Sequence, residues 1–425
     1  MAEIVTMKFF KNITAATKRL LPLLIMFGLF PFFKVSAQEA NLDWKLNDVS
    51  EAQQVLTNLG TLIGHPVELG YPGLIRSEFP ANSGIEHVGE GGVWFGGITP
   101  DNDTLVTSTT SWAPAPFWET YPSDAPWDTI WTVNRGETVD IPYWENYTGI
   151  SDQDFVMRYN DYGPASQRID RHEPLYLEFI QTSYHWSGPK GLDRAIVHTY
   201  YITPTQFDIE NGYFTFWLDA NVGDQSQGTH FQDDFTRFNE NLGVAYSGDA
   251  EGGSDGTAES LIGAMLFPPE DIPEANLKYT FQWGDQPFAP GMIPPEDAEK
   301  YSELMAEGGI MQDQQTPTGA HFTYSVGPFD LAKGDTLRIQ VAQVFGEDEE
   351  DLRATANLIN RLIKQDFKVP GPPPSPPLRV TNKNHGVELN WRPTAQNNPE
   401  TYEDPNRADG IDQPFEGYRL YKSTQ

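Results

Sequence analysis

The sequence contains no cysteine among its 425 residues. Disulfide bonds and thiolate chemistry are therefore excluded, both as a framework for the fold and as a source of metal ligands or nucleophiles. Basic residues are also scarce, because 28 Lys and Arg stand against 60 Asp and Glu and give a net charge of -32. Such an acidic protein repels the phosphates of nucleic acids, and we expect no nucleic-acid partner.

Several motifs that mark enzyme classes are absent as well. The sequence holds no HExxH, no Walker loop and no GxGxxG that opens a helix, and these patterns identify zinc proteases, P-loop enzymes and dinucleotide-binding enzymes. With 60 acidic residues, a pair of carboxylates can always be chosen, so the sequence gives no signal for or against a glycosidase. We expect a protein without catalytic activity.

Long apolar runs are missing except near the N-terminus. LLPLLIMFGLFPFF occupies residues 20–33 and follows Lys18 and Arg19. This run is shorter than the about 20 residues that a membrane-spanning helix needs, and the small residues of VSA at 35–37 follow it. We predict a secretory signal peptide at residues 1–37, no transmembrane segment after its removal, and an extracellular location at the outer cell surface.

Short runs of alternating apolar and polar residues recur between Gly, Pro, Asn and Asp, and this alternation predicts β-strands. The runs are 91–98, 103–109, 128–135, 175–186, 195–203, 212–219, 277–283, 320–326 and 335–345. Helices do not alternate with them as parallel sheets require. The sequence therefore predicts a mainly β protein, with an antiparallel β-sandwich body and a few peripheral helices.

Two segments are predicted to be helical. PPEDAEKYSELMAEGG (294–309) begins with Pro and acids and ends with Gly. EDEEDLRATANLINRLIKQDF (347–367) carries an apolar stripe that would pack on a sheet. The stripe consists of Leu352, Ala356, Ile359, Leu362 and Ile363. Residues 51–64 also have helical propensity.

A Pro-rich segment, KVPGPPPSPP (368–377), predicts a stiff linker because consecutive prolines fix φ and continue neither helix nor central strand. It divides a β-rich extracellular domain (38–367) from residues 378–425. The latter resemble the start of a fibronectin type III domain through LRVT, VELNW and GYRLY. The resemblance implies an incomplete Ig-like domain whose strands have exposed edges.

The body resembles large exported surface proteins of the Bacteroidota and related phyla. The matching stretches are EFPANSGIEHVGEGGVWFGGI with DTLVTS (79–108), WLDANVGD with DDFTRFNENLGVAYSGD (217–249), and VGPFDLAKGDTLRIQVAQVFGEDEEDL (326–352). The resemblance implies surface display, fibronectin type III modules after the β-rich body, and often a type IX secretion sorting domain. It implies no particular chemistry.

The stretch WLDANVGDQSQGTHFQDDF (217–235) places several oxygen donors within a short span, and these are Asp219, Asn221, Asp224, Asp233 and Asp234. Calcium takes six to eight such ligands from a loop. The spacing is not that of an EF-hand, because His230 stands where that motif needs Glu. The sequence leaves two alternatives open, a calcium site or a turn that is solvated or capped by its own side chains.

An aromatic loop is the second candidate site. It contains Trp112, Trp118, Tyr121, Trp127 and Trp131. Exposed rings beside polar groups can stack on sugars, whereas aromatics next to Pro also plug the open end of a sandwich. We therefore expect a structural, adhesion or display protein, stabilised by Ca²⁺ if calcium binds, with cell-surface or matrix partners. The alternative is a carbohydrate-binding or carbohydrate-active extracellular protein with a polysaccharide partner.

Overall fold

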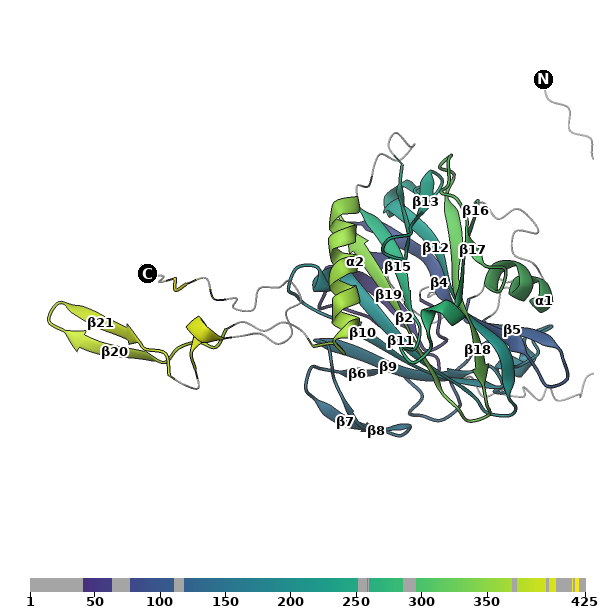
Figure 1. Ribbon diagram of the computed structural model, residues 1–425, viewed down its shortest axis with the longest axis horizontal. Helices are drawn as coiled ribbons and strands as arrows, with labels where there is room; N and C mark the ends of the chain where they lie inside the picture. The colour runs from purple at the N-terminus through teal and green to yellow at the C-terminus, as the bar shows by residue number, and fades with distance from the viewer. Residues whose placement is uncertain are drawn as a thin grey trace, which may run out of the picture. The chain divides into compact units, whose positions relative to one another are not determined.

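The computed structural model describes residues 41–62, 77–110, 118–250, 258, 260–285, 296–368, 373–394, 397–402, 415 and 417–419. Two large sheets dominate these residues (Figure 1). Every strand pair within the two sheets is antiparallel except one, in which a strand of two residues runs parallel to a strand of eight residues. The predicted fold class, a mainly β protein with an antiparallel β-sandwich body, is therefore confirmed.

The first sheet has nine strands in the order β1-β2-β3-β4-β12-β18-β16-β17, with β5 also paired to β4. Its strands are β1 (Trp44–Leu46), β2 (Gln53–Thr57), β3 (Ser77–Glu78), β4 (Ile85–Ile98), β5 (Thr104–Ser108), β12 (Ile209–Asp224), β16 (Lys278–Asp285), β17 (Gly309–Ile310) and β18 (Ala320–Leu331). The long strands β4, β12 and β18 form its centre. Two of the candidate carboxylates, Glu90 on β4 and Asp219 on β12, lie on this central part.

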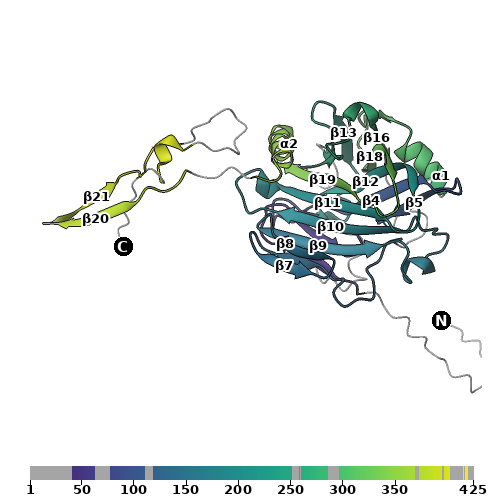
Figure 2. The ribbon, with the colours of Figure 1, turned by 60° about the horizontal axis from the view of Figure 1, so that its bottom comes forward.

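The second sheet has eight strands in the order β13-β14-β15-β19-β11-β10-β9-β6. Its strands are β6 (Trp131–Val133), β9 (Gln153–Asn160), β10 (Leu177–His185), β11 (Ala195–Pro204), β13 (Asp234–Asn239), β14 (Val244–Asp249), β15 (Leu261–Phe267) and β19 (Leu337–Gly346). A separate hairpin, seen at the lower edge of the sandwich in Figure 2, joins β7 (Thr138–Ile141) to β8 (Trp144–Thr148). Residues of this hairpin form a small apolar cluster with β6 and β9.

The main core lies between the two sheets. Along β12, Phe214, Phe216 and Leu218 are fully buried in this core. The alternate residues Tyr213 and Trp217 belong to a second cluster on the opposite face of the sheet. This alternation follows from the period of two in a β-strand, and it means that both faces of the first sheet are covered.

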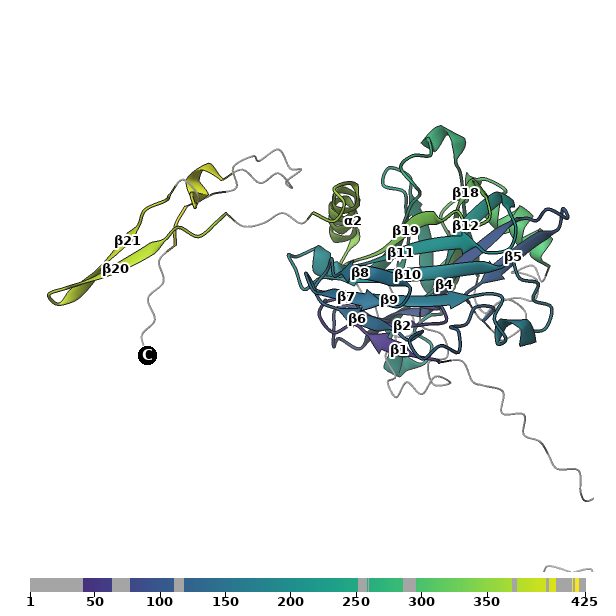
Figure 3. The same cartoon turned by 90° about the horizontal axis from the view of Figure 1, so that it is seen from below.

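Two helical segments cover outer faces. α2 (Glu349–Lys364) begins at Asp348, whose side chain accepts a hydrogen bond from the Asp351 N–H, so the first turn is capped. Its buried side chains pack beside β15 and β19, as the apolar stripe predicts (Figure 1). α1 (Asp297–Glu299) continues into the π-helical η6 (Lys300–Met305), and this segment lies near β5 (Figure 3). Short 3-10 turns complete the described elements, namely η2 (Ser166–Arg168), η3 (Leu192–Arg194), η4 (Gln225–Gln227), η5 (Glu274–Asn276) and η7 (Pro399–Thr401).

The structure corrects the prediction in several places. Residues 51–64 are not helical where they are described, since Gln53–Thr57 form β2 between β1 and β3. The predicted helix 294–309 is helical from Asp297 to Met305 and changes to π-type after its first turn. The predicted loop 217–235 is shorter, because β12 continues to Asp224. For residues 53–57 and 217–224, pairing with neighbouring strands overrides local propensity.

The C-terminal segment contains a two-stranded hairpin of β20 (Leu378–Lys383) and β21 (Gly386–Trp391). These strands coincide with the predicted LRVT and VELNW. Its apolar side chains Leu378, Val380 and Val387 are exposed. A hairpin of this size cannot bury a core by itself. None of the described helices is long and apolar enough to cross a membrane.

Candidate functional site

Three polar side chains form a row across the centre of the first sheet. Glu90 on β4 lies opposite Asp219 on β12, and Asp219 lies opposite His321 on β18. All three are buried, and the His321 ring lies 6.0 Å from the ring of Trp217. Directly opposed residues on neighbouring strands have adjacent side chains. Strand pairing therefore brings two carboxylates and an imidazole together from positions far apart in the sequence.

A glycine makes room for the next pair of donors. A Cβ atom at Gly89 would lie 2.3 Å from Asn221 Nδ2 and 3.0 Å from Asp219 Oδ2. Both side chains thus lie against the backbone of β4 at a place that only glycine fits. The Oδ1 atom of Asn221 is buried and has no hydrogen-bond donor among the described residues. This oxygen is available to a ligand next to Asp219.

Asp234 lies at the centre of a cluster of carboxylates. It is fully buried, and its Oδ2 accepts a hydrogen bond of 2.9 Å from the Val222 N–H. Its Oδ1 is buried with no donor in the described part of the chain. Burial raises the pKa of Asp234 well above its ordinary range. The hydrogen bond from the Val222 N–H lowers this pKa, and the nearby carboxylates of Asp249, Asp233 and Asp219 raise it further.

The backbone around Asp234 is held firmly. Asp234 lies opposite Asp249 in the pairing of β13 with β14. Its carbonyl oxygen accepts hydrogen bonds from the N–H groups of Thr318 and Gly319, at 3.2 and 3.1 Å. The Oδ2 atom of Asp249 accepts one of 2.6 Å from the Ala258 N–H. The acidic cluster is defined here as Asp219, Asp233, Asp234 and Asp249. Three of its members lie on paired strands, and Asp233 lies in the turn that directly precedes β13.

The sequence-predicted metal ligands divide into two groups in the structure. Asp219, Asn221, Asp233 and Asp234 lie together, whereas no contact of the described residues joins Asp224 to them. Asp224 instead caps η4, where its Oδ1 accepts a hydrogen bond of 2.9 Å from the Ser226 N–H. Asp249 and Glu90 were not among the predicted ligands, and only the strand register brings them close.

The loop between Asp224 and Asp233 is fastened by a different contact. His230 Nε2 lies 2.9 Å from Glu86 Oε2 on β4, and both side chains are buried. The residue at the position where an EF-hand carries Glu therefore serves to fix this loop to the sheet. In the described part of the chain, no group of three or more His, Asp or Glu side chains is arranged so that it could hold a metal ion as it stands.

The predicted aromatic site is spread over different environments. Trp112 lies outside the described residues. Trp118 is buried, and Tyr121 forms a β-bridge with Asn160. Trp127 is 43% exposed, and its carbonyl oxygen accepts a hydrogen bond of 2.9 Å from Trp131 Nε1. Trp127 thus presents a ring to solvent, while Trp118 does not.

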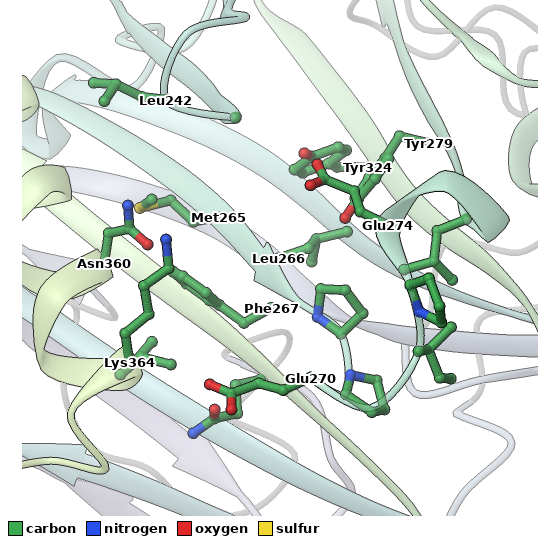
Figure 4. Close-up of a pocket in the computed structure, with 18 of the residues that line it drawn as sticks. Leu242, Met265, Leu266, Phe267, Glu270, Glu274, Tyr279, Tyr324, Asn360 and Lys364 are labelled. Carbon is green, nitrogen blue, oxygen red and sulfur yellow. The ribbon is translucent and has the colours of Figure 1, made fainter.

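A groove with a cavity volume of about 1250 Å³ lies at another part of the sandwich. Figure 4 shows Asn360 and Lys364 of α2 on one side, and Glu274, Tyr279 and Tyr324 on the other. Leu266, at the end of β15, lies between them. Its lining comes from β13, β15, β16, β17, β18, β19 and α2, from the turn between β13 and β14, and from the connection that includes η5. No local motif marks such a groove, and sequence reasoning missed it.

Comparisons with known proteins give only distant similarities. No protein-family model and no curated protein matches the sequence. Among solved structures, the chain is similar to a protein assigned as a kojibiose phosphorylase from the human microbiome, at 7% identity and a TM-score of 0.27, over 63% of this chain and 27% of that one. It is also similar to a protein assigned as an aldose 1-epimerase from Escherichia coli K12, at 6% identity and a TM-score of 0.26, over 72% of this chain and 99% of that one.

A third similarity is to an inverting mannosidase from Bacteroides thetaiotaomicron, at 8% identity and a TM-score of 0.20, over 55% of this chain and 31% of that one. All three proteins are named for reactions on carbohydrates. TM-scores this low establish neither a common family nor a shared activity, so the function has to be argued from this chain's own residues.

Proposed function

We propose that this protein is an extracellular, non-catalytic β-sandwich module of the cell surface that calcium stabilises. The calcium proposal depends on one observation at Asp234, which is fully buried. Its Oδ1 atom has no hydrogen-bond donor among the described residues, and the carboxylates of Asp219, Asp233 and Asp249 lie nearby. A buried carboxylate that is neither paired nor fully hydrogen-bonded opposes folding. A cation at this point would remove that penalty.

Calcium fits the donor set better than other metals. The cluster offers carboxylate oxygens from Asp219, Asp233, Asp234 and Asp249, and an amide oxygen from Asn221. Hard cations prefer oxygen ligands, and calcium tolerates the irregular geometry and high ligand number that such a set provides. The second alternative of the sequence, a turn capped by its own side chains, describes Asp224.

The proposed surface location is supported by the N-terminal sequence, and the absence of cysteine is compatible with the proposed role of calcium. The basic and apolar segment before Ala37 has the features of a secretory signal. An exported protein of this size commonly gains stability from disulfides, and this one has no cysteine. Calcium, which is plentiful outside cells, would supply a cross-link between β12, β13 and β14 in their place. Adhesion or display with surface and matrix partners follows as the role of such a rigid module.

Calcium is expected to raise the melting temperature of the full chain by a few degrees relative to EDTA. A ligand at a hundred times its Kd adds about 2.7 kcal/mol of stability. In Asp234→Asn the calcium-dependent rise in melting temperature should disappear. In EDTA at neutral pH, this variant should melt at a higher temperature than the wild type, because asparagine keeps the shape of the side chain and removes its charge. Thermal melts with EDTA, calcium and magnesium, together with calorimetric titration of calcium, measure both effects.

The matched control is Asp224→Asn, which removes a carboxylate from the same stretch of chain outside the cluster. It should retain the calcium shift of the wild type. The proposal fails if the wild type shows no shift, or if Asp234→Asn keeps a full one. A lower melting temperature of Asp234→Asn in EDTA would show that the carboxylate is already stabilised without a metal.

A carbohydrate-binding function is the second candidate, and the groove between α2 and β16 is the observation that favours it. Half-buried aromatic rings and exposed polar groups meet there, whereas the aromatic loop contributes the exposed ring of Trp127 but not that of Trp118.

A further inference from the structure

The groove is rigid on the side formed by the connection from β15 to β16. This connection contains Pro268, Pro269 and Pro273, and it leads into the 3-10 turn η5. Prolines restrict the backbone, so this wall has little conformational freedom to lose when a ligand binds. The opposite wall is the end of α2, which is anchored by its buried apolar stripe. Both walls are therefore preorganised.

Aromatic rings form one side of the groove. The rings of Tyr279 and Tyr324 lie 6.1 Å apart with a tilt of 34°, and Phe238 packs edge-on against Tyr324 at 5.3 Å. Tyr279 is half-buried and presents part of its ring to the groove, while Tyr324 is buried behind it. Ring faces of this kind stack on the C–H surfaces of sugar rings. A lipid would not need the polar groups that accompany them.

Carboxylates and an amide lie beside these rings. Burial raises the pKa of Tyr279, and the carboxylate of Glu274 raises it further, which places that carboxylate near the phenol. Glu270, Asn360 and Lys364 also project into the groove (Figure 4). Carboxylate and amide groups hydrogen-bond to adjacent hydroxyls, which are the polar groups that sugars carry.

The charged side chains of the groove are not paired with one another. Four acids and two bases line it, and these are Glu240, Glu270, Glu274, Asp366, Arg338 and Lys364. None of them takes part in an ion pair within the described residues. Their hydrogen-bonding capacity is available to a ligand. The excess of acids disfavours phosphates and anionic polysaccharides.

We propose that this groove binds a neutral oligosaccharide of a few sugar units, with Tyr279 as the stacking ring and Glu274 as a hydroxyl acceptor. The cavity volume of about 1250 Å³ exceeds what one monosaccharide fills, since pockets for single small ligands have about 300 to 1,000 Å³. The groove shares no residue with the acidic cluster, so oligosaccharide binding in the groove does not depend on calcium binding at the cluster.

The test is binding of the full chain to an array of neutral cello-, manno-, xylo- and malto-oligosaccharides, followed by calorimetric titration with the best of them. Tyr279→Ala should weaken binding about tenfold or more, while Tyr279→Phe should stay within about threefold because the ring remains. Glu274→Gln should weaken binding by about tenfold through loss of a charged acceptor. Thermal melts check that each variant is folded.

Trp127→Ala is the matched control, because it removes an exposed aromatic ring outside the groove. It should bind as the wild type does. The inference is overturned if no neutral oligosaccharide binds, if Tyr279→Ala binds normally, or if Trp127→Ala alone abolishes binding. Binding of acidic oligosaccharides in preference to neutral ones would overturn it as well.

Discussion

Replacing Phe214 by Ala is expected to lower the free energy of unfolding by about 4 kcal/mol, which is near the upper end for truncation of a single core side chain. Phe214 lies on β12, which pairs with both β4 and β18. Its side chain has no exposed surface, and its ring lies 5.6 Å from that of Tyr200 on the second sheet. The two rings therefore form a direct contact between the sheets, and alanine leaves a cavity there.

Urea unfolding of the full chain, followed by fluorescence and circular dichroism, measures the change. Phe214→Leu should cost only about 1 kcal/mol because it keeps most of the apolar volume. Equal losses in the two variants would indicate that the effect comes from the ring contact rather than from the cavity. A loss in Phe214→Ala of less than about 2 kcal/mol would contradict the placement of this residue between two packed sheets.

Much of the fold follows from local pattern. All nine predicted alternating runs contain strands, and the capped, striped segment after Asp348 contains α2. Alternation works because most strands contribute one face to the core. It fails for LIGAMLF, which is β15, because both faces of that strand are covered and no alternation remains. It also fails for β2, whose residues favour a helix in isolation but pair between β1 and β3.

Only part of the candidate site could be predicted from the sequence. Asp219 and Asn221 stand two residues apart on one strand, so their common face follows from the period. Asp224 stands three residues after Asn221, so the same period places it on the opposite face of the strand. The pairing of β12 with β4 also shifts register after Asp219 and again after Ala220. Asp249 reaches Asp234 only through the register of β13 with β14. Among 60 acidic residues, nothing local distinguishes it.

Asp161→Ala is expected to destabilise the protein about as strongly as the truncation of Phe214. The Asp161 carboxylate is fully buried and accepts hydrogen bonds from three donors. Its Oδ2 accepts from the Thr107 hydroxyl at 2.6 Å and the Leu175 N–H at 2.9 Å, and its Oδ1 accepts from the Leu177 N–H at 2.7 Å. Alanine leaves all three donors buried without this acceptor, at a total of about 4 kcal/mol.

The contribution of Asp161 to stability is expected to depend on pH, because its carboxyl group titrates at different pH values in the folded and unfolded states. Burial raises the pKa of Asp161 to about 6, although its three donors and the nearby His172 act in the opposite direction. In the unfolded chain the carboxyl titrates near its ordinary value of 3.8. The folded state therefore holds its proton more tightly, and the stability that this group contributes is greatest below pH about 4 and declines as the pH rises to about 6.

Asp161→Asn, which cannot ionise and keeps one acceptor oxygen, should lack this decline. The free energy of unfolding of Asp161→Asn should therefore fall further below that of the wild type at pH about 4.5 than at pH about 7. Phe214→Ala is the control, because it removes no titrating group. Its loss of unfolding free energy should be the same at both pH values. A deficit of Asp161→Asn that grows with pH would mean that the folded state favours the ionised carboxylate. The three donors would then outweigh burial, and the pKa of Asp161 would lie below its ordinary value.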